Sequence, residues 1–264
     1  MAEIKVENLT DPRQAYPFLA RERLYSAYAV GTLEAESWAC CTALLARSGE
    51  EDSAFFLLAQ PPETASTLFL MGEPAALQKI FEHPLARAAF AWISAKDEHL
   101  GCLKRYWRLE EPEEMLRMVV QRDDFRPPEK PPEVDLQRLG PADQSALAEI
   151  YDTAFGTPTA ARLITRGPYY GVWNKGQLIS VAGTHIVSRK FGLAAVGNVW
   201  TRPPYRGQGL ATLASGAVTW ELLETYQEVV LNVREDNLPA RRVYERLGFK
   251  THCHFWQMRG RWRS

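Results

Sequence analysis

Two glycines and two arginines between residues 202 and 211 have the spacing of a diphosphate-binding loop. The stretch RPPYRGQGLA contains Gly207 and Gly209, and the proline-free segment after it, ATLASGAVTWELLETY, spaces its apolar residues as a helix does. The first N–H groups of a helix have no internal partner and carry the positive end of the helix dipole, so a phosphate can accept hydrogen bonds from them. Glycine lets the backbone approach closely. Arg202 and Arg206 add positive charge.

The spacing excludes two common phosphate-binding loops. A P-loop has Lys-Ser/Thr after its last glycine, where this chain has Leu210-Ala211, and a dinucleotide-binding loop has a third glycine, where Thr212 stands. The pattern that remains is Arg206-x-x-Gly209-x-Ala211. These six residues alone leave open a glycine-containing loop that simply ends a strand.

A second motif follows downstream. Residues 228–233 (EVVLNV) are typical of a buried strand, and residues 237–250 predict a helix. Asn237 suits the N-cap and Pro239 the first turn, whereas Gly248 stands where a C-cap belongs. The segment reads N-x-x-A-x-x-x-Y-x-x-x-G-F, through Asn237, Ala240, Tyr244, Gly248 and Phe249.

The two motifs, in this order, resemble the signatures of the GNAT superfamily of acetyl-CoA-dependent N-acetyltransferases. The resemblance covers residues 134 to about 258 and implies the GNAT fold, a mixed and mostly antiparallel sheet flanked by helices. It implies acetyl-CoA as the acyl donor, an amine of a small molecule or peptide as the acceptor, direct transfer without an acyl-enzyme, and no metal. The loop would contact the pyrophosphate and not the acyl chain, so transfer of an acyl group longer than acetyl is a further possibility.

The resemblance also implies a set of cofactor-binding residues. In the family the central strand pairs through its backbone with the pantetheine arm, and the matching residues here are Val199, Trp200 and Thr201. Asn232 and Asn237 match positions that often contact the cofactor, although Asn237 fits a plain N-cap equally well. The pyrophosphate loop comprises Arg206, Gly207, Gln208, Gly209, Leu210 and Ala211.

Tyr244 is the catalytic candidate. It matches the tyrosine that in many family members hydrogen-bonds the coenzyme A sulfur and can act as a general acid. A phenol, with an unperturbed pKa of about 10, is protonated at neutral pH and can donate. The alternative is a core aromatic on an amphipathic helix.

The general base is not evident from the sequence. Many family members have a glutamate on the central strand, but residues 194–201 contain no carboxylate, and Asn198 is the only polar side chain before Thr201. Deprotonating an alkylammonium at pH 7 costs about 4–5 kcal/mol. The candidates are His185, Glu235 and Asp236, each of which could also be an ordinary surface, core or loop residue.

Two further features of the site stay open. The backbone N–H near Val199 could stabilise the oxyanion, as the family suggests. The acceptor pocket could be lined by Arg162, Arg166, Tyr169 and Tyr170, which could equally be surface residues. The missing strand carboxylate leaves a second function open, a non-catalytic acyl-CoA-binding or sensing protein, against which the presence of Tyr244 argues.

The predicted elements define an α+β protein of two domains. Residues 1–125 form an N-terminal α+β domain, the proline-rich RPPEKPPE at 126–133 is a linker, and residues 134–264 form the acetyltransferase domain. The N-terminal domain has no second phosphate loop, since Gly72 is followed by Glu73 and Pro74. It is either a degenerate GNAT-like domain that has lost its cofactor site or an unrelated α+β domain.

The helices and strands on which this domain assignment depends follow from hydrophobic periodicity and from the positions of glycine and proline, which interrupt regular structure. In the first half we expect helices over 12–46, 74–82 and 99–107 and strands over 53–60, 67–71, 90–93 and 115–121. In the second half we expect helices over 144–155, 157–165 and 211–226 and strands over 134–139, 169–173, 177–187, 194–201 and 249–258.

Composition limits the function classes. With 46% hydrophobic and 24% charged residues and a formal net charge of -1, the chain is typical of a globular protein and not of a nucleic-acid binder. The chain has neither an apolar run of transmembrane length nor a signal-peptide core, so we expect a cytoplasmic protein without a membrane partner. The apolar first half could provide a homodimer surface. Cys40, Cys41, Cys102 and Cys253 lack metal-ligand spacing and are expected to be reduced, buried thiols.

Overall fold

The computed structural model describes residues 3–62, 65–155 and 164–263. Contacts divide the chain into two compact units, residues 1–116 with 253–264, and residues 117–252. The C-terminal segment therefore belongs to the first unit, whereas the sequence-based boundaries assigned it to the second domain. It belongs there because β12 (Lys250–Trp262) pairs antiparallel with β5 (Phe90–Ala95). The paired residues run from Trp256 opposite Ala95 to Arg261 opposite Phe90.

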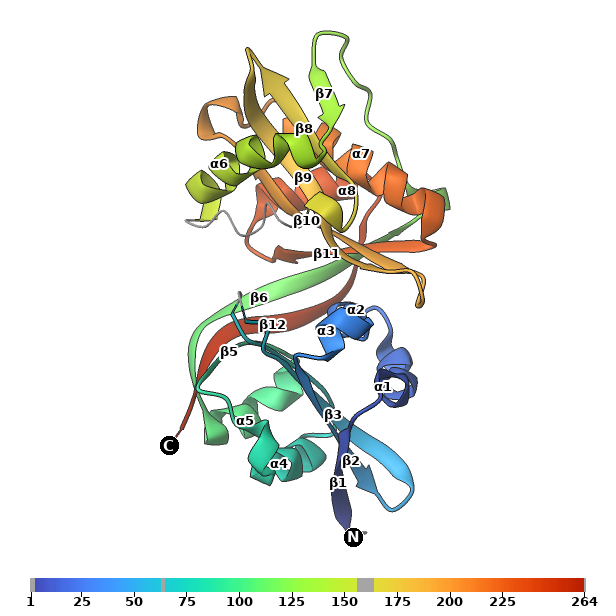
Figure 1. Cartoon of the computed structure of the whole chain (residues 1–264), viewed down its shortest axis with the longest axis vertical. Coiled ribbons are helices and arrows are strands. Elements are labelled where there is room, and N and C mark those ends of the chain that lie inside the picture. The colour runs from blue at the N-terminus through green and yellow to red at the C-terminus, as the bar shows by residue number, and fades with distance from the viewer. Residues whose placement is uncertain (1–2, 63–64, 156–163, 264) are drawn as a thin grey trace. The chain divides into compact units, whose positions relative to one another are not determined.

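The first unit has the strand order β1-β2-β3-β4-β5-β12 (Figure 1). Its other elements are β1 (Ile4–Leu9), α1 (Pro12–Leu19), α2 (Ala27–Gly31), α3 (Ala35–Trp38), β2 (Cys41–Ser48), β3 (Glu51–Ala59), β4 (Thr67–Gly72), α4 (Pro74–Glu82), α5 (Asp97–Tyr106) and the first part of β6 (Trp107–Gln121). Its core is apolar and includes Phe56, Phe81, Ile93 and Trp107.

One sequence-based assignment in the first unit is wrong. Residues 12–46 were expected to be helical, but Cys41–Ser48 is strand β2, between β1 and β3. Its Ala-Leu-Leu-Ala run suits a helix by propensity, and pairing on both edges overrides that weak preference. Strand β1 was not expected. None of the four cysteines is in a disulfide bond, and only Cys102 is buried as expected, whereas the other three are half-buried.

The second unit has the strand order β6-β11-β10-β9-β8-β7 (Figure 1). Its elements are β7 (Asp135–Arg138), α6 (Gln144–Phe155), β8 (Tyr169–Asn174), β9 (Gln177–Ser188), β10 (Leu193–Thr201), α7 (Leu210–Thr225), β11 (Glu228–Arg234) and α8 (Leu238–Arg246). The expected order of these elements is confirmed. The helix expected over 157–165 lies mostly outside the described residues.

Helices α6 and α7 cover opposite faces of this sheet. Leu178 packs with Leu147, Ile150 and Tyr151 of α6, whereas its neighbour Ile179 packs with Leu210 and Leu213 of α7. Adjacent strand residues point to opposite faces, so one sheet serves two cores. The fold is the mixed, mostly antiparallel sheet with flanking helices that the sequence predicts.

The proline-rich segment packs on the second unit. A Cβ added at Gly216 of α7 would come within 2.6 Å of Pro128. Arg126 N donates to Leu247 O (3.0 Å), and the Phe125 ring lies 6.1 Å from that of Trp220. Residues 125–128 are thus part of this unit's surface rather than a free tether.

The two units repeat one order of strands and helices. In each, three antiparallel pairings (β1/β2, β2/β3 and β3/β4; β7/β8, β8/β9 and β9/β10) are followed by a helix and a parallel pairing (β4/β5; β10/β11). A further helix follows each parallel pair. This repeat supports a GNAT-like N-terminal unit over an unrelated α+β domain.

In the first unit, protein atoms fill the position that corresponds to the phosphate-binding loop of the second unit. A Cβ at Gly72 would lie 2.3 Å from Ser53 O, and Glu73 and Pro74 begin the helix there. His99, fully buried in α5, accepts from Lys96 N through Nδ1 and so donates from Nε2 to Gly72 O (2.9 Å). Burial lowers the pKa of His99, in keeping with this neutral form. These contacts support the hypothesis that this unit has lost its cofactor site.

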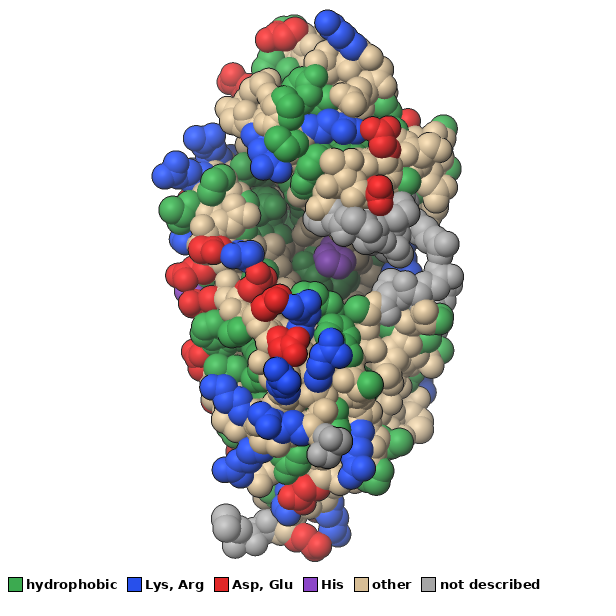
Figure 2. Space-filling view, turned by 90° about the vertical axis from the view of Figure 1, so that its left-hand side faces the viewer, with side chains coloured by type: hydrophobic (Ala, Val, Ile, Leu, Met, Phe, Trp, Pro, Cys, Tyr) green, Lys and Arg blue, Asp and Glu red, His purple; other side chains and the backbone are tan. Residues whose placement is uncertain are grey.

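None of the helices in the described residues is long and apolar enough to cross a membrane. Figure 2 shows lysine and arginine side chains interspersed with aspartate and glutamate over one face of the molecule. This agrees with the near-neutral net charge of the sequence.

Candidate active site

The loop before α7 has the geometry that its glycines predict. Gly207 and Gly209 have φ angles of +77° and +78°, and Gly209 is the N-cap of α7. The first helical hydrogen bond runs from Leu213 N to Gly209 O (3.1 Å), which leaves the N–H groups of residues 210–212 without a helical partner. No side chain caps the helix, and nothing lies within 4 Å of a Cβ built at either glycine. An anion could therefore reach these N–H groups.

The two arginines of the loop behave differently. Arg206 is exposed, its Nε donates to Thr201 O (3.0 Å), and its guanidinium lies 5.9 Å from the centre of the Trp200 ring. Arg202 instead donates to Leu178 O (2.9 Å) and Glu149 Oε1 (2.6 Å). The expectation that Arg202 adds charge to the loop is not met by these contacts, because Glu149 pairs with it.

Strand β10 separates from β11 before it reaches the loop. In the described chain their parallel pairing ends at Ala195–Val230, although β10 continues to Thr201 and β11 to Arg234. On its other side β10 stays paired with β9 and bulges between Gly197 and Trp200. Asn198, in the bulge, has a φ of +54°. The backbone of Val199 to Thr201 thus has an edge that β11 does not pair.

Two buried tyrosines hold the bulge. Tyr151 of α6 donates to Asn198 O (2.8 Å), and Asn198 Nδ2 donates to the hydroxyl of Tyr169, which donates to Thr184 O (3.1 Å). Burial raises the pKa of both phenols, which keeps them protonated as donors. The sequence analysis missed Tyr151 and assigned Tyr169 to the acceptor pocket, since no local pattern links these residues to Asn198.

The asparagines of β11 and α8 have different surroundings. Asn232 Oδ1 is buried and accepts no hydrogen bond within the described residues. This unsatisfied acceptor lies on β11, one of the two strands that separate. Asn237 Oδ1 accepts from Ala240 N (3.2 Å) and caps α8, as its N-cap assignment predicts. An amide N–H of a pantetheine arm would satisfy Asn232.

Tyr244 and Gly248 form the end of α8. Gly248 N donates to Glu245 O (3.1 Å), and Phe249 N donates to Tyr244 O (3.0 Å), the two bonds of a Schellman motif. The Tyr244 and Phe249 rings meet edge to face, 6.0 Å apart. Tyr244 is 7% exposed. The Y-x-x-x-G-F pattern is therefore a helix cap with its hydrophobic contact, whatever else Tyr244 does.

The candidate bases differ in environment. Asp236 is exposed and pairs with Arg234 (2.7 Å), which lowers its pKa and weakens it as a base. His185 on β9 lies against Gly197, because a Cβ at Gly197 would be 2.9 Å from His185 Nδ1. Its side chain is solvent-accessible, yet surrounding protein, with Arg117 and Arg166, lowers its pKa to about 4. His185 is the candidate beside the separated stretch of β10, and it is neutral at pH 7.

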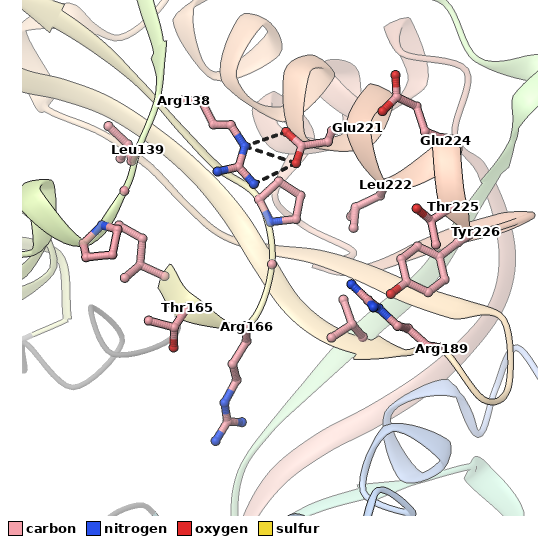
Figure 3. A pocket seen from close by; sticks show the side chains of 16 residues that line it. Arg138, Leu139, Thr165, Arg166, Arg189, Glu221, Leu222, Glu224, Thr225 and Tyr226 are labelled. Atoms are coloured by element: carbon pink, nitrogen blue, oxygen red, sulfur yellow. Dashed lines mark hydrogen bonds and ion pairs between the residues drawn. The ribbon is translucent and has the colours of Figure 1, made fainter.

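A pocket of about 570 Å³ lies at the C-terminal end of α7 (Figure 3). On one wall Arg138 Nη2 pairs with Glu221 Oε1 (2.8 Å), and Tyr170 donates to Glu221 (2.9 Å). The hydrogen bond from Arg138 lowers the pKa of Glu221. Burial, followed by the hydrogen bond to Glu221, raises the pKa of Tyr170 to about 12. Tyr170 thus joins β8 to α7. Arg166 lines the pocket, while Arg162 lies outside the described residues.

Comparisons with known proteins agree with this geometry. Residues 121–249 match the model of the acetyltransferase (GNAT) family. A GCN5-related N-acetyltransferase from Sphaerobacter thermophilus has a TM-score of 0.67 at 15% identity, over 98% of this chain and 96% of that one. An acetyltransferase from the GNAT family of Colwellia psychrerythraea has a TM-score of 0.61 at 14% identity, over 97% and 99%.

A tandem GNAT protein from the clavulanic acid biosynthesis pathway has a TM-score of 0.62 at 16% identity, and the match covers 98% of each chain. A comparison of the sequence with curated proteins gave no match. The full-length likeness to a tandem protein agrees with the repeat of strands and helices in the two units. Residues 121–249 are therefore an acetyltransferase domain of the GNAT family, and the protein is an acyltransferase that has a GNAT-like unit before that domain.

Proposed function

We propose that the protein transfers an acetyl group from acetyl-CoA directly to an amine. The observation that carries the proposal is that one strand–loop–helix unit combines two features. Strand β10 has an edge that β11 does not pair, and the loop after it leaves the first N–H groups of α7 open. A long ligand with a diphosphate at one end and amides along its arm would satisfy both.

The residues present fit such a ligand. The N–H groups at 207–211 and Arg206 would hold the pyrophosphate. The backbone of Val199 and Thr201 would pair with the pantetheine amides, and the buried Asn232 Oδ1 would accept from one of them. Trp200 and Gln208 flank these contacts, and Asn237 stays committed to its cap.

The chemistry requires one bond to form and one to break. The amine nitrogen attacks the thioester carbonyl carbon, the C–S bond breaks, and the thiolate leaves with the electron pair. Tyr244 would give its phenolic proton to the sulfur, and the N–H near Val199 would stabilise the oxyanion. The amine proton would pass to His185 or water and from there return through solvent to the Tyr244 phenolate. The sum is then acetyl-CoA plus amine giving amide plus coenzyme A, with the enzyme unchanged.

Turnover tests the proposal against the alternative of a non-catalytic sensor. Acetyl-CoA at about a hundred times its dissociation constant should stabilise the protein by about 2.7 kcal/mol, which thermal unfolding detects. An enzyme then releases free thiol in proportion to an added amine, measured with a thiol reagent. Stabilisation without thiol release from a broad amine panel would favour the sensor, and no stabilisation at millimolar acetyl-CoA would refute both.

The variant Tyr244→Phe should lower kcat about 100-fold, because it removes the proton donor, and leave the KM for acetyl-CoA near its original value. Phenylalanine keeps the ring contact with Phe249, so the helix cap survives. Tyr226→Phe is the matched control, a second buried tyrosine outside both motifs. An unchanged kcat in Tyr244→Phe would restrict Tyr244 to packing.

A further inference from the structure

An extra residue in β10 leaves one peptide group outside the regular sheet. The register with β9 passes from Gly197–Gly183 to Trp200–Val181, so that two residues of β10 lie opposite one residue of β9. The pairing with β11 has already ended before this point. Asn198, in the bulge, has a φ of +54°, a left-handed conformation that asparagine tolerates better than most residues. Regular pairing alone therefore does not fix the orientation of the peptide between Asn198 and Val199.

A tyrosine of α6 fixes the carbonyl end of this peptide. The hydroxyl of Tyr151 donates to Asn198 O (2.8 Å). Tyr151 is fully buried and belongs to the same apolar cluster as Leu147, Leu178 and Tyr169, so its ring is held by the core that α6 covers. The carbonyl of Asn198 is thus directed toward the α6 side of the sheet.

A second tyrosine holds the side chain of the same residue. Asn198 Nδ2 donates to the hydroxyl of Tyr169 (2.8 Å), which in turn donates to Thr184 O (3.1 Å). Both the carbonyl and the side-chain amide of Asn198 therefore bond to tyrosines of one buried cluster. The two bonds together hold Asn198 in its left-handed conformation and give the bulge a single arrangement.

The geometry of the peptide group then sets the direction of the next N–H. The peptide is trans and planar, so the N–H of Val199 points opposite to the C=O of Asn198. Because that carbonyl points to Tyr151, the N–H of Val199 points away from the α6 core. When an amine adds to a thioester, negative charge develops on the acyl oxygen, and a donor whose direction is already fixed stabilises it most.

We propose that Tyr151 is a positioning residue for acyl transfer, which holds the Asn198–Val199 peptide so that the N–H of Val199 donates to the acyl oxygen. The inference rests on the proposed function and assigns to it a residue that neither sequence motif contains. Tyr151 acts through this peptide and not on the substrate, because its side chain is fully buried in the core.

The variant Tyr151→Phe removes the hydroxyl and keeps the ring. Its kcat and its kcat/KM for acetyl-CoA should fall together by about tenfold or more, with KM unchanged within about twofold, because the N–H acts on the oxyanion of the transition state. Thiol release is measured with the amine of the panel that reacts fastest. Tyr25→Phe is the matched control, since Tyr25 is 1% exposed and donates to the backbone Leu70 O (2.9 Å) in the first unit. Equal kcat in the two variants would overturn the proposal.

A second acyl donor separates positioning from a loss of folded protein. Fluorine on the acyl group withdraws electrons, so the oxyanion depends less on a hydrogen-bond donor. The loss in Tyr151→Phe should therefore shrink from about tenfold with acetyl-CoA to less than about threefold with fluoroacetyl-CoA. A structural defect lowers the turnover of both donors by the same factor, and that result would contradict the proposal. If Tyr151→Phe does not fold, Tyr169→Phe, which releases the Asn198 side chain, is judged by the same comparison.

A spectroscopic measurement separates this inference from the proposed function. Acetyl-CoA carrying an isotope label at its carbonyl carbon is bound, and infrared difference spectra record the C=O stretch. A donor at the acyl oxygen polarises the carbonyl, so the stretch should lie at lower frequency in the unaltered protein than in Tyr151→Phe. That shift supports the inference even where no amine yields thiol, and the proposed function alone then fails. Turnover with equal frequencies in the two proteins overturns the inference alone, and absence of acetyl-CoA binding refutes both.

Discussion

Gly209→Asp should weaken acetyl-CoA binding by about 150-fold or more. The introduced carboxylate would lie at the N-terminus of α7, where it accepts hydrogen bonds from the N–H groups that the pyrophosphate needs and repels its charge. Loss of two charge-assisted hydrogen bonds corresponds to about 3 kcal/mol or more. Isothermal titration with coenzyme A measures the affinity, and the thermal shift with acetyl-CoA should disappear.

A second glycine in the same unit provides a matched control. Gly176, in the turn between β8 and β9, has the same φ of +78° as Gly209, and nothing lies within 4 Å of a Cβ built there. Gly176→Asp therefore causes similar backbone strain without touching the loop, and should leave the affinity unchanged. If the two variants bind coenzyme A equally well, the pyrophosphate does not occupy the N-terminus of α7.

The site elements with local signals could be predicted from the sequence. The loop at 206–211 combines breakers, two glycines and the start of an uninterrupted helical pattern, all within a few residues. The end of α8 is equally local, because Asn237, Tyr244 and Gly248 lie within one helix and its caps. Local backbone preferences suffice to specify such pieces, and the structure confirms their conformations.

The parts that depend on distant residues could not be predicted. Tyr151 reaches Asn198 across 47 positions, and Arg202 turns to Glu149 across 53. Strand β12 returns to β5, more than 150 residues earlier in the chain, which moves the C-terminal segment into the first unit. Neither hydrophobic period nor motif spacing records such pairings, since they depend on which segments meet after the strands are formed.

Gly248→Ala should destabilise the second unit by about 3 kcal/mol or more. Gly248 has a φ of +93°, which costs an L-residue about 1–2 kcal/mol. A Cβ there would also lie 2.0 Å from Asp124 O and 2.9 Å from its carbonyl carbon. Both groups are backbone, so the clash can be relieved only if the segment that leads into the linker moves. Urea unfolding followed by circular dichroism measures the change.

The control separates strain from contact. Gly176→Ala places alanine at a similarly positive φ in open space, so it should cost only about 1–2 kcal/mol. The difference in unfolding free energy between the two variants measures the cost of the close contact between the new Cβ and the Asp124 backbone. Since Gly248 closes the cap whose hydrophobic contact holds the Tyr244 ring, the destabilised variant should also lose turnover, whereas Gly176→Ala should not. Equal stability in the two variants would mean that the Asp124 backbone can move away at no cost in free energy. Gly248 and Phe249 would then serve the helix cap alone.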